Sequence, residues 1–224
     1  MAIVVFAGFA RTFYLRMFFP EAIEMAAPEP IFYVHGSVFT AWICFLVAQT
    51  LFIRNRKIAL HRSLGWFGAG LAVAVVLLGI YGSLVAAQRP GGFIGVPLPP
   101  LQFLAIPLFD IVLFGLFVGL AVAWRQNAAS HKRLMMLATI NLIEAAIIRI
   151  PIDFIIAGAP FASRGLSYIF IIALVIRDLR TTGRVHRVTL WGGLIIVVSF
   201  PVRMLISQTQ TWVGFAGWAV GLTG

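Results

Sequence analysis

Residues 64–87 read LGWFGAGLAVAVVLLGIYGSLVAA, a run of 24 residues without a charged side chain. A helix needs about 20 mostly apolar residues to cross a bilayer, so this run predicts a transmembrane helix. The whole chain shares this character, because 61% of its 224 residues are hydrophobic and only 11% are charged. Soluble domains carry about 25% charged residues. We therefore expect an integral membrane protein, and we interpret its net charge of +10 as loop charge rather than as a nucleic-acid surface.

Similar apolar segments recur along the chain and predict an all-α bundle of seven transmembrane helices. The expected spans are Ala2–Phe19, Ile31–Ile53, Leu64–Ala87, Leu101–Trp124, Leu134–Ala157, Leu166–Ile176 with its flanks, and Thr189–Ile206. Residues 1–224 then form a single transmembrane domain, with its core helices within residues 31–157. The tail, residues 209–224, is too short for another span, and its tryptophans favour an interfacial helix.

Basic residues concentrate in alternate links between these spans. The links after the second, fourth and sixth spans hold Arg54, Arg56, Lys57, Arg62, Arg125, Lys132, Arg133, Arg177, Arg180, Arg184 and Arg187. The other links hold Glu21, Glu24, Glu29, Arg89 and Arg164. Because short cytoplasmic loops carry an excess of Lys and Arg, this pattern predicts a cytoplasmic N-terminus and a C-terminus outside.

Several classes of membrane protein are excluded by missing residues. The single cysteine, Cys44, permits no intrachain disulfide, no covalently attached c-type haem and no cysteine-based metal cluster. The two lysines, Lys57 and Lys132, both lie in inner links, so no buried lysine exists for a retinal Schiff base. The sequence predicts no catalytic residue, and whether the protein is an enzyme stays open.

Ionisable residues inside the expected spans form the first candidate site. They are Arg11, His35, Asp110, Glu144, Arg149, Asp153 and Arg203, all at middle to outer depth. Such residues are costly in a bilayer and face the bundle interior. They form either a structural ion-pair network or a polar pocket, open to the outer side, for a quinone-like headgroup, an ion or a proton.

Two pairings within this set follow from spacing. Asp110 and Glu144 reach nearly the same depth on adjacent antiparallel helices, and we expect Arg149, one turn further out, to neutralise them. Arg149 and Asp153 stand at i and i+4 and can pair on one helix, which Pro151 between them should kink.

The histidines form the second candidate site. His61, His131 and His186 share one level at the inner interface, and any two of them satisfy the depth requirement of a bis-histidine b-type haem. The basic residue that follows each of them could meet haem propionates or, equally, lipid phosphates. A site in which all three histidines bind one metal ion is a further alternative. Our expectation, however, is that haem iron is the one metal that the chain could hold. His35 lies near the other face without a histidine partner at its height.

The motifs resemble those of a family of uncharacterised bacterial inner-membrane proteins. They are FARTFY at residues 9–14, HG at 35–36, LHRSLG at 60–65, HKRLM at 131–135, RVH at 184–186 and LWGG at 190–193. The subset in residues 31–157 is also distantly similar to four-helix cytochrome-b-like and haem-assembly membrane proteins. The resemblance implies a multi-pass protein of the bacterial inner membrane. It also implies that His35, His61 and His131 contact a cofactor, whereas His186 lies outside the shared core.

These observations leave three functions open. The first is a membrane redox protein in electron transport that binds b-type haem, a quinone-like ligand or both. The second is a non-catalytic accessory subunit of a larger respiratory or photosynthetic membrane complex. The third is a transporter or ligand-binding membrane protein that uses the buried charges.

Overall fold

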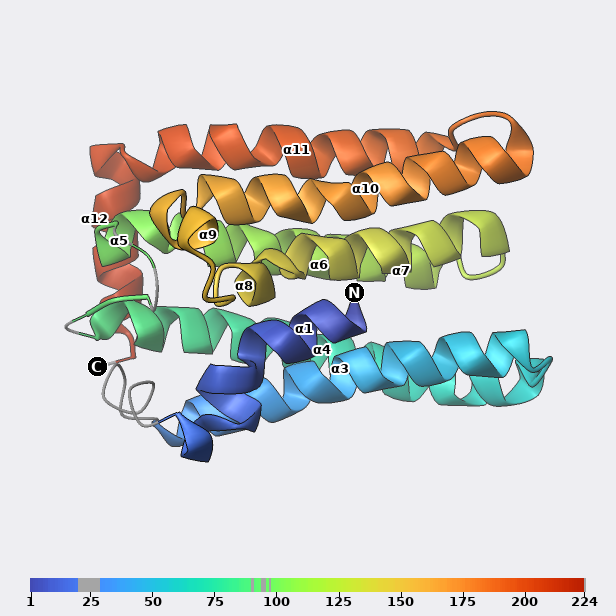
Figure 1. Cartoon of the computed structure of the whole chain (residues 1–224), viewed down its shortest axis with the longest axis horizontal. Coiled ribbons are helices and arrows are strands. Elements are labelled where there is room, and N and C mark those ends of the chain that lie inside the picture. The colour runs from blue at the N-terminus through green and yellow to red at the C-terminus, as the bar shows by residue number, and fades with distance from the viewer. Residues whose placement is uncertain (20–28, 90, 94–95, 97, 224) are drawn as a thin grey trace.

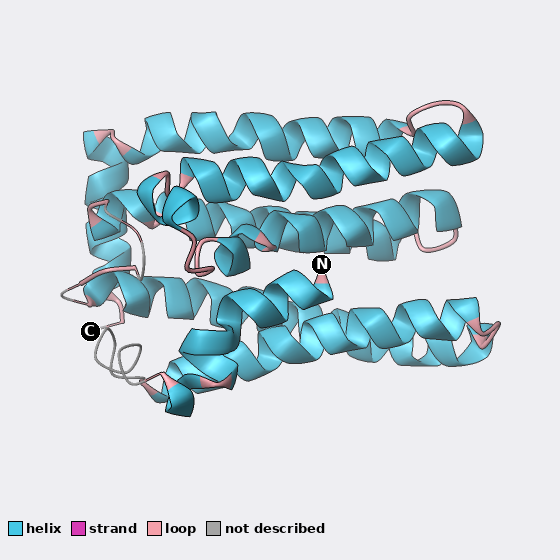
Figure 2. Cartoon of the chain, viewed as in Figure 1, coloured by secondary structure: helices cyan, strands magenta, loops and turns pink. Residues whose placement is uncertain are grey.

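The computed structural model describes residues 1–19, 29–89, 91–93, 96 and 98–223, and Glu21 and Glu24 of the first expected link lie outside them. The described chain is helical, with helices joined by short loops and turns, and no strand occurs in it (Figure 2). The helices are α1 (Ala2–Phe9), α3 (Pro30–Arg54), α4 (Ile58–Gln88), α5 (Pro100–Phe103), α6 (Ala105–Ala123), α7 (Ala128–Leu142), α8 (Glu144–Ile147), α9 (Asp153–Ala157), α10 (Phe161–Thr182), α11 (Arg187–Ser207) and α12 (Gln210–Gly221). Two short irregular helices, η1 (Ala10–Tyr14) and η2 (Arg16–Phe18), follow α1.

Among the described residues, four helical segments are long and apolar enough to cross a membrane. They are Pro30–Arg54, Ile58–Gln88, Pro100–Ala123 and Arg187–Ser207, which correspond to the second, third, fourth and seventh expected spans. Large apolar side chains on their outer faces stay exposed, as at Trp66 (67%) and Leu205 (70%). This pattern is consistent with contact to lipid, because lipid chains solvate an apolar surface that water would not.

Of the other three expected spans, the first and the fifth are divided and the sixth is a continuous helix. The first is divided among α1, η1 and η2, and α1 with η1 forms only a short apolar helix. The fifth is not one continuous helix, because α7 ends at Leu142 and the chain turns again between Ile147 and Asp153. The interruption before Asp153 agrees with the expected kink, since Pro151 cannot continue a helix. The sixth, α10, forms a 22-residue helix that begins at Phe161.

Helices α3, α4, α6, α7, α10 and α11 run side by side along the long axis of the bundle (Figure 1). The links α3–α4, α6–α7 and α10–α11 lie at one end, and α5, α9 and α12 lie at the other. The basic links of the sequence therefore share one end of the molecule. Helix α12 crosses the opposite end, where the Trp212 indole N–H donates to the Leu101 carbonyl at 2.8 Å.

The core lies around α6, whose Phe114 and Phe117 are buried against Trp42, Leu137 and Ile196 from three other helices. Close packing depends on small residues at the crossings. A Cβ on Gly192 would overlap the Leu137 side chain, and a Cβ on Gly8 would overlap the Ala146 carbonyl. Gly8 thus allows α1 to lie directly against α8, which positions α1 as one wall of the site described below.

Candidate functional site

Two acids and two arginines form a buried charge network between α6, α8, α10 and α11. Arg164 donates to Asp110 Oδ2 at 2.7 Å and also contacts the Glu144 carboxylate. Arg203 donates to Asp110 Oδ1 at 2.6 Å and to the Ile106 carbonyl at 3.0 Å. All four residues are buried, and their charges cancel.

The expected pairing of Asp110 and Glu144 with Arg149 is wrong. Arg164 bridges the two acids instead, although we had expected it in an outer link. The reason is that α10 begins at Phe161, so Arg164 already lies on its buried face. The helical spacing of Ser163, Ser167 and Ile171 on that face was the signal that would have revealed it. Ser163 adds a hydrogen bond of 3.1 Å to Glu144.

Arg149 and Asp153 form no ion pair in the described part of the chain. Arg149 follows α8, donates to the Ala145 carbonyl and lies 4.9 Å from the centre of the Phe9 ring. Asp153 begins α9 and is exposed, after an extended Ile152 with φ −119° and ψ 126°. Because the helix is broken between them, the i,i+4 spacing no longer places the two side chains together.

A cavity of about 260 Å³ lies next to the charge network, between α1–η1, α3, α4, α6 and α8. Its wall is mainly apolar and aromatic, and includes Phe9, Phe13, Phe39 and Trp42. Its polar lining residues include Thr12, Arg16, His35, Ser83, Arg89, Asp110, Thr139, Glu144 and Arg149. A mostly apolar cavity with a few convergent polar groups is typical of a site for a small organic ligand.

Two side chains of the cavity wall, His35 and Thr12, each hold a polar atom that could bond to a ligand. His35 contacts the Leu78 carbonyl through Nδ1 at 3.1 Å, so Nδ1 carries the proton and Nε2 is left as an acceptor. The Thr12 hydroxyl is buried and has no hydrogen-bond partner within the described chain. Gly82 permits the close approach of the His35 ring, since a Cβ there would lie 3.0 Å from Nδ1.

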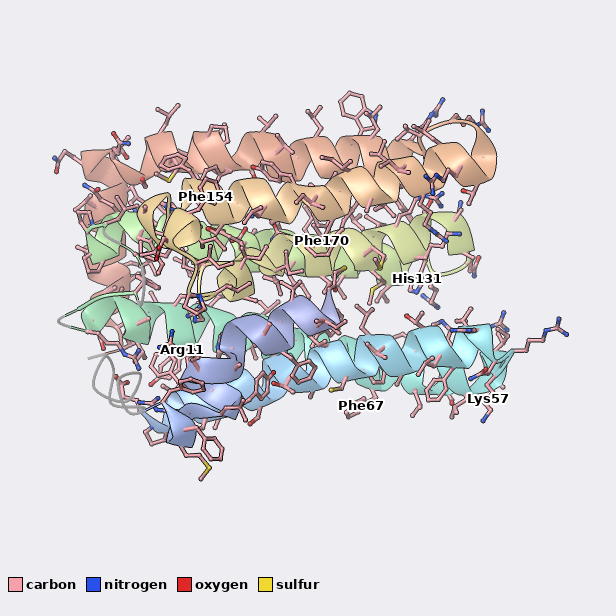
Figure 3. All side chains as sticks on the ribbon, viewed as in Figure 1. Arg11, Lys57, Phe67, His131, Phe154 and Phe170 are labelled. Atoms are coloured by element: carbon pink, nitrogen blue, oxygen red, sulfur yellow. The ribbon has the colours of Figure 1, made fainter. Side chains whose placement is uncertain are left out.

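Arg11 belongs to η1 but is not one of the described residues that line the cavity. Its guanidinium lies 5.2 Å from the centre of the Phe19 ring, and Figure 3 shows it beside the α1–η1 segment. Of the seven ionisable residues expected at this depth, His35, Asp110, Glu144 and Arg149 line the cavity and Arg203 supports it. Arg11 and Asp153 lie apart from it.

His61 and His131 meet near the end of the bundle that carries the basic links, where Figure 3 shows His131 and Lys57. Their ring centroids are 6.2 Å apart and the ring planes are nearly perpendicular, at 79°. His61 Nδ1 contacts the Gln49 side-chain oxygen, and His131 Nδ1 contacts the Ala121 carbonyl at 2.8 Å. Both contacts are to acceptors, so each ring keeps Nε2 as a potential metal ligand.

His186 is engaged elsewhere. Its side chain caps α11 by accepting from the Val188 N–H at 3.2 Å, and its backbone N–H donates to Asp178 at 3.2 Å. Asp178 also accepts from Arg133 at 3.0 Å and from Thr189 at 2.6 Å. These hydrogen bonds form a second polar network, at the end of the bundle that carries the basic links, which the sequence did not predict. Partial burial lowers the pKa of His186, and the Arg133 charge lowers it further. The alternative of a three-histidine metal site is not formed, because the described residues contain no group of three or more His, Cys, Asp or Glu able to hold a metal ion.

No family model matches the chain, and no curated protein or solved structure matches it. The class of the protein therefore follows from its own fold and residues. It is an all-α protein with apolar helices long enough to cross a membrane, a buried charge network and an adjacent cavity.

Proposed function

We propose that the chain is a multi-pass protein of the bacterial inner membrane, with its basic links on the cytoplasmic side. The support is the gathering of the α3–α4, α6–α7 and α10–α11 links at one end of the bundle. The four long apolar helices would then cross the bilayer, and α7 with its continuation and α10 would cross beside them. The first expected span is divided among α1, η1 and η2, and Figure 1 shows the N-terminus alongside the middle of the bundle, so these residues extend over only part of its length.

Cysteine labelling tests this orientation. A cysteine at Asn55 should resist an impermeant thiol reagent in intact cells, and a cysteine at Gly91 should react. Both residues are exposed, and a side chain at Gly91 meets no atom within 4 Å. Cys44 would be replaced by serine as the background. The reverse pattern of labelling would overturn the orientation.

The cavity on the outer side would bind a small quinone-like molecule, and this binding is the function that the geometry supports best. The observation that carries it is the combination of an aromatic cavity with a histidine acceptor, a buried hydroxyl without a partner and an arginine. A planar ring would pack among Phe9, Phe39 and Trp42, and its oxygens would meet the polar groups at the wall. A ligand oxygen near Thr12 would also satisfy that hydroxyl, which costs free energy while it is buried alone.

A binding experiment with a matched pair of variants tests the cavity. Titration calorimetry of the detergent-solubilised protein with menadione, a quinone without a long tail, should show saturable binding. Ala145→Phe, which places a ring in the cavity, should abolish it. Ala157→Phe adds the same ring at an exposed position on α9 outside the described cavity lining, and should bind as wild type. Absence of binding to wild type, or unchanged binding by Ala145→Phe, would refute the proposal.

A b-type haem held by His61 and His131 is the second candidate, and it rests on the ring geometry. A metal–imidazole nitrogen bond is about 2.0–2.1 Å long. The ring centroids of His61 and His131 are 6.2 Å apart, a separation at which one nitrogen of each ring could bind the same iron. The two Nε2 atoms would hold the iron, and a bound haem would supply one-electron chemistry. A chain that bound haem at this histidine pair and a quinone in the cavity would be a membrane redox protein.

Visible spectroscopy of the purified protein tests this second candidate. A low-spin haem spectrum should appear, and His61→Ala and His131→Ala should each abolish it. His35→Ala and His186→Asn should retain it, because neither residue belongs to the pair. A wild-type protein expressed with ample haem that shows no Soret band would exclude haem at this site.

A further inference from the structure

Arg149 is a cation in the cavity wall that forms no ion pair among the described residues, although Glu144 lies close enough for the two charges to interact. Its guanidinium donates to the Ala145 carbonyl and lies over the Phe9 ring, neither of which carries a charge. Asp110 and Glu144 line the same cavity but already pair with Arg164 and Arg203. In the described chain, Arg149 thus differs from those two arginines, whose charges are neutralised within the protein.

The remaining described acids do not compensate Arg149 either. Asp178 pairs with Arg133 at the opposite end of the bundle, and Glu29 lies 3.5 Å from Arg89. Asp153 is exposed on α9 and forms no ion pair with Arg149. Among the described residues, Arg149 is therefore a cation of the aromatic cavity wall that forms no ion pair. Such a charge is costly at membrane depth unless a counter-charge accompanies it.

The other lining residues favour negative rather than neutral ligands. Arg89 and Arg16 line the cavity together with Arg149, so three of its wall residues are arginines. Arg89 is stacked on Phe32 at 3.8 Å from the ring centre and is partly balanced by Glu29, whereas Arg149 forms no ion pair with a described residue. A ligand with a negative oxygen next to Arg149 would give this guanidinium the counter-charge that its described neighbours do not supply as an ion pair.

We propose that the cavity binds its quinone-like ligand as an anion, with an ionised ring hydroxyl against Arg149. The chemical class is a hydroxyquinone, a planar ring whose acidic hydroxyl is deprotonated at neutral pH. The ring would pack on the aromatic wall, and Arg149 would donate to the charged oxygen. This inference rests on the proposed function and adds the charge of the ligand to it.

The test compares two quinones of the same ring system. Lawsone carries an acidic hydroxyl that is ionised at neutral pH, and menadione carries a methyl group in that position. Calorimetric titration of wild-type protein should give a dissociation constant for lawsone at least about tenfold lower than for menadione, a difference of about 1.4 kcal/mol. Arg149→Gln should remove this preference, and Arg149→Lys should keep most of it because it keeps the charge.

Arg125→Gln is the matched control, since Arg125 lies at the other end of the bundle from the cavity, and it should leave the preference unchanged. Each outcome is informative. Equal binding of both quinones by wild type would overturn the anion inference and leave the quinone proposal standing. A preference that survives in Arg149→Gln would overturn the role of Arg149. Failure of both quinones to bind would refute the proposed function itself. The wild-type comparison needs no variant, so the inference stays testable if Arg149→Gln does not fold.

Discussion

Replacing Arg164 by methionine should destabilise the protein more than any other single change to its charge network. Arg164 contacts both Asp110 and Glu144 and is only 1% exposed. Methionine keeps much of the side-chain volume, so the main loss is electrostatic. Glu144 then loses its ion-pair partner among the described residues, and Asp110 keeps the pair with Arg203. Removing one partner of a buried ion pair costs about 3–5 kcal/mol.

The matched comparison is Arg149→Met, which removes an arginine that has no acid partner in the described chain. Its cost should be below about 1 kcal/mol, since no carboxylate is stranded. Glu144→Gln in the Arg164→Met background should recover part of the loss, because it removes the stranded charge. In a chain of this size, about 3–5 kcal/mol corresponds to a fall in Tm of roughly 6–20 °C.

The assay is thermal unfolding in a mild detergent, followed by tryptophan fluorescence at neutral pH. The reasoning predicts that Arg164→Met melts far below wild type and that Arg149→Met melts close to it. If Arg164→Met melts within a degree or two of wild type, the four charges do not form a stabilising network. If Arg149→Met is the less stable variant, then Arg149 rather than Arg164 neutralises the acids.

Two further predictions concern packing and pH. Gly8→Ala should lower both Tm and quinone affinity, because its Cβ would overlap the Ala146 carbonyl and displace α1 from the cavity wall. Gly119→Ala is the control, because a Cβ there meets nothing within 4 Å. It should leave quinone binding unchanged and be neutral or stabilising by about 0.5–1 kcal/mol. Because the pKa of His186 lies below its usual 6.5 in the folded protein, protonation favours unfolding, and stability should fall as pH drops below that value. His186→Asn keeps an N-cap acceptor for Val188 but cannot titrate, so its Tm should fall less than that of wild type between neutral and mildly acidic pH; identical pH profiles would argue against this assignment.

The long apolar helices were predictable because bilayer thickness imposes a length that the sequence displays directly. The expected span Ile31–Ile53 and the helix Pro30–Arg54 nearly coincide. Helix α4 begins at Ile58, six residues before the expected Leu64, because helical structure continues past the apolar run into the basic link. The division of residues 134–157 was only partly predictable. Pro151 signalled one interruption, but no residue type signals the turn at Ile143.

The site was predictable in its composition and less so in its pairing. Depth counting correctly brought Asp110 and Glu144 to one region, since both carboxylates contact the same guanidinium. It failed for Arg164 because charge alone assigned that residue to a link, although the buried spacing of α10 includes it. His186 is expected at the same membrane depth as the other inner histidines, but depth does not specify the direction in which a ring points. Its Nδ1 caps α11 by accepting from the Val188 N–H instead.

Photo-crosslinking with an azido-substituted quinone tests the central claim most directly. The labelled protein would be digested and the modified residues located by mass spectrometry, with excess unlabelled quinone as competitor. The account predicts competed labels within residues 9–16, 32–43 and 139–149, the segments that surround the cavity. Labels spread over the exposed outer faces of α4 and α11, unaffected by competitor, would show that the quinone only dissolves around the protein and would contradict the account.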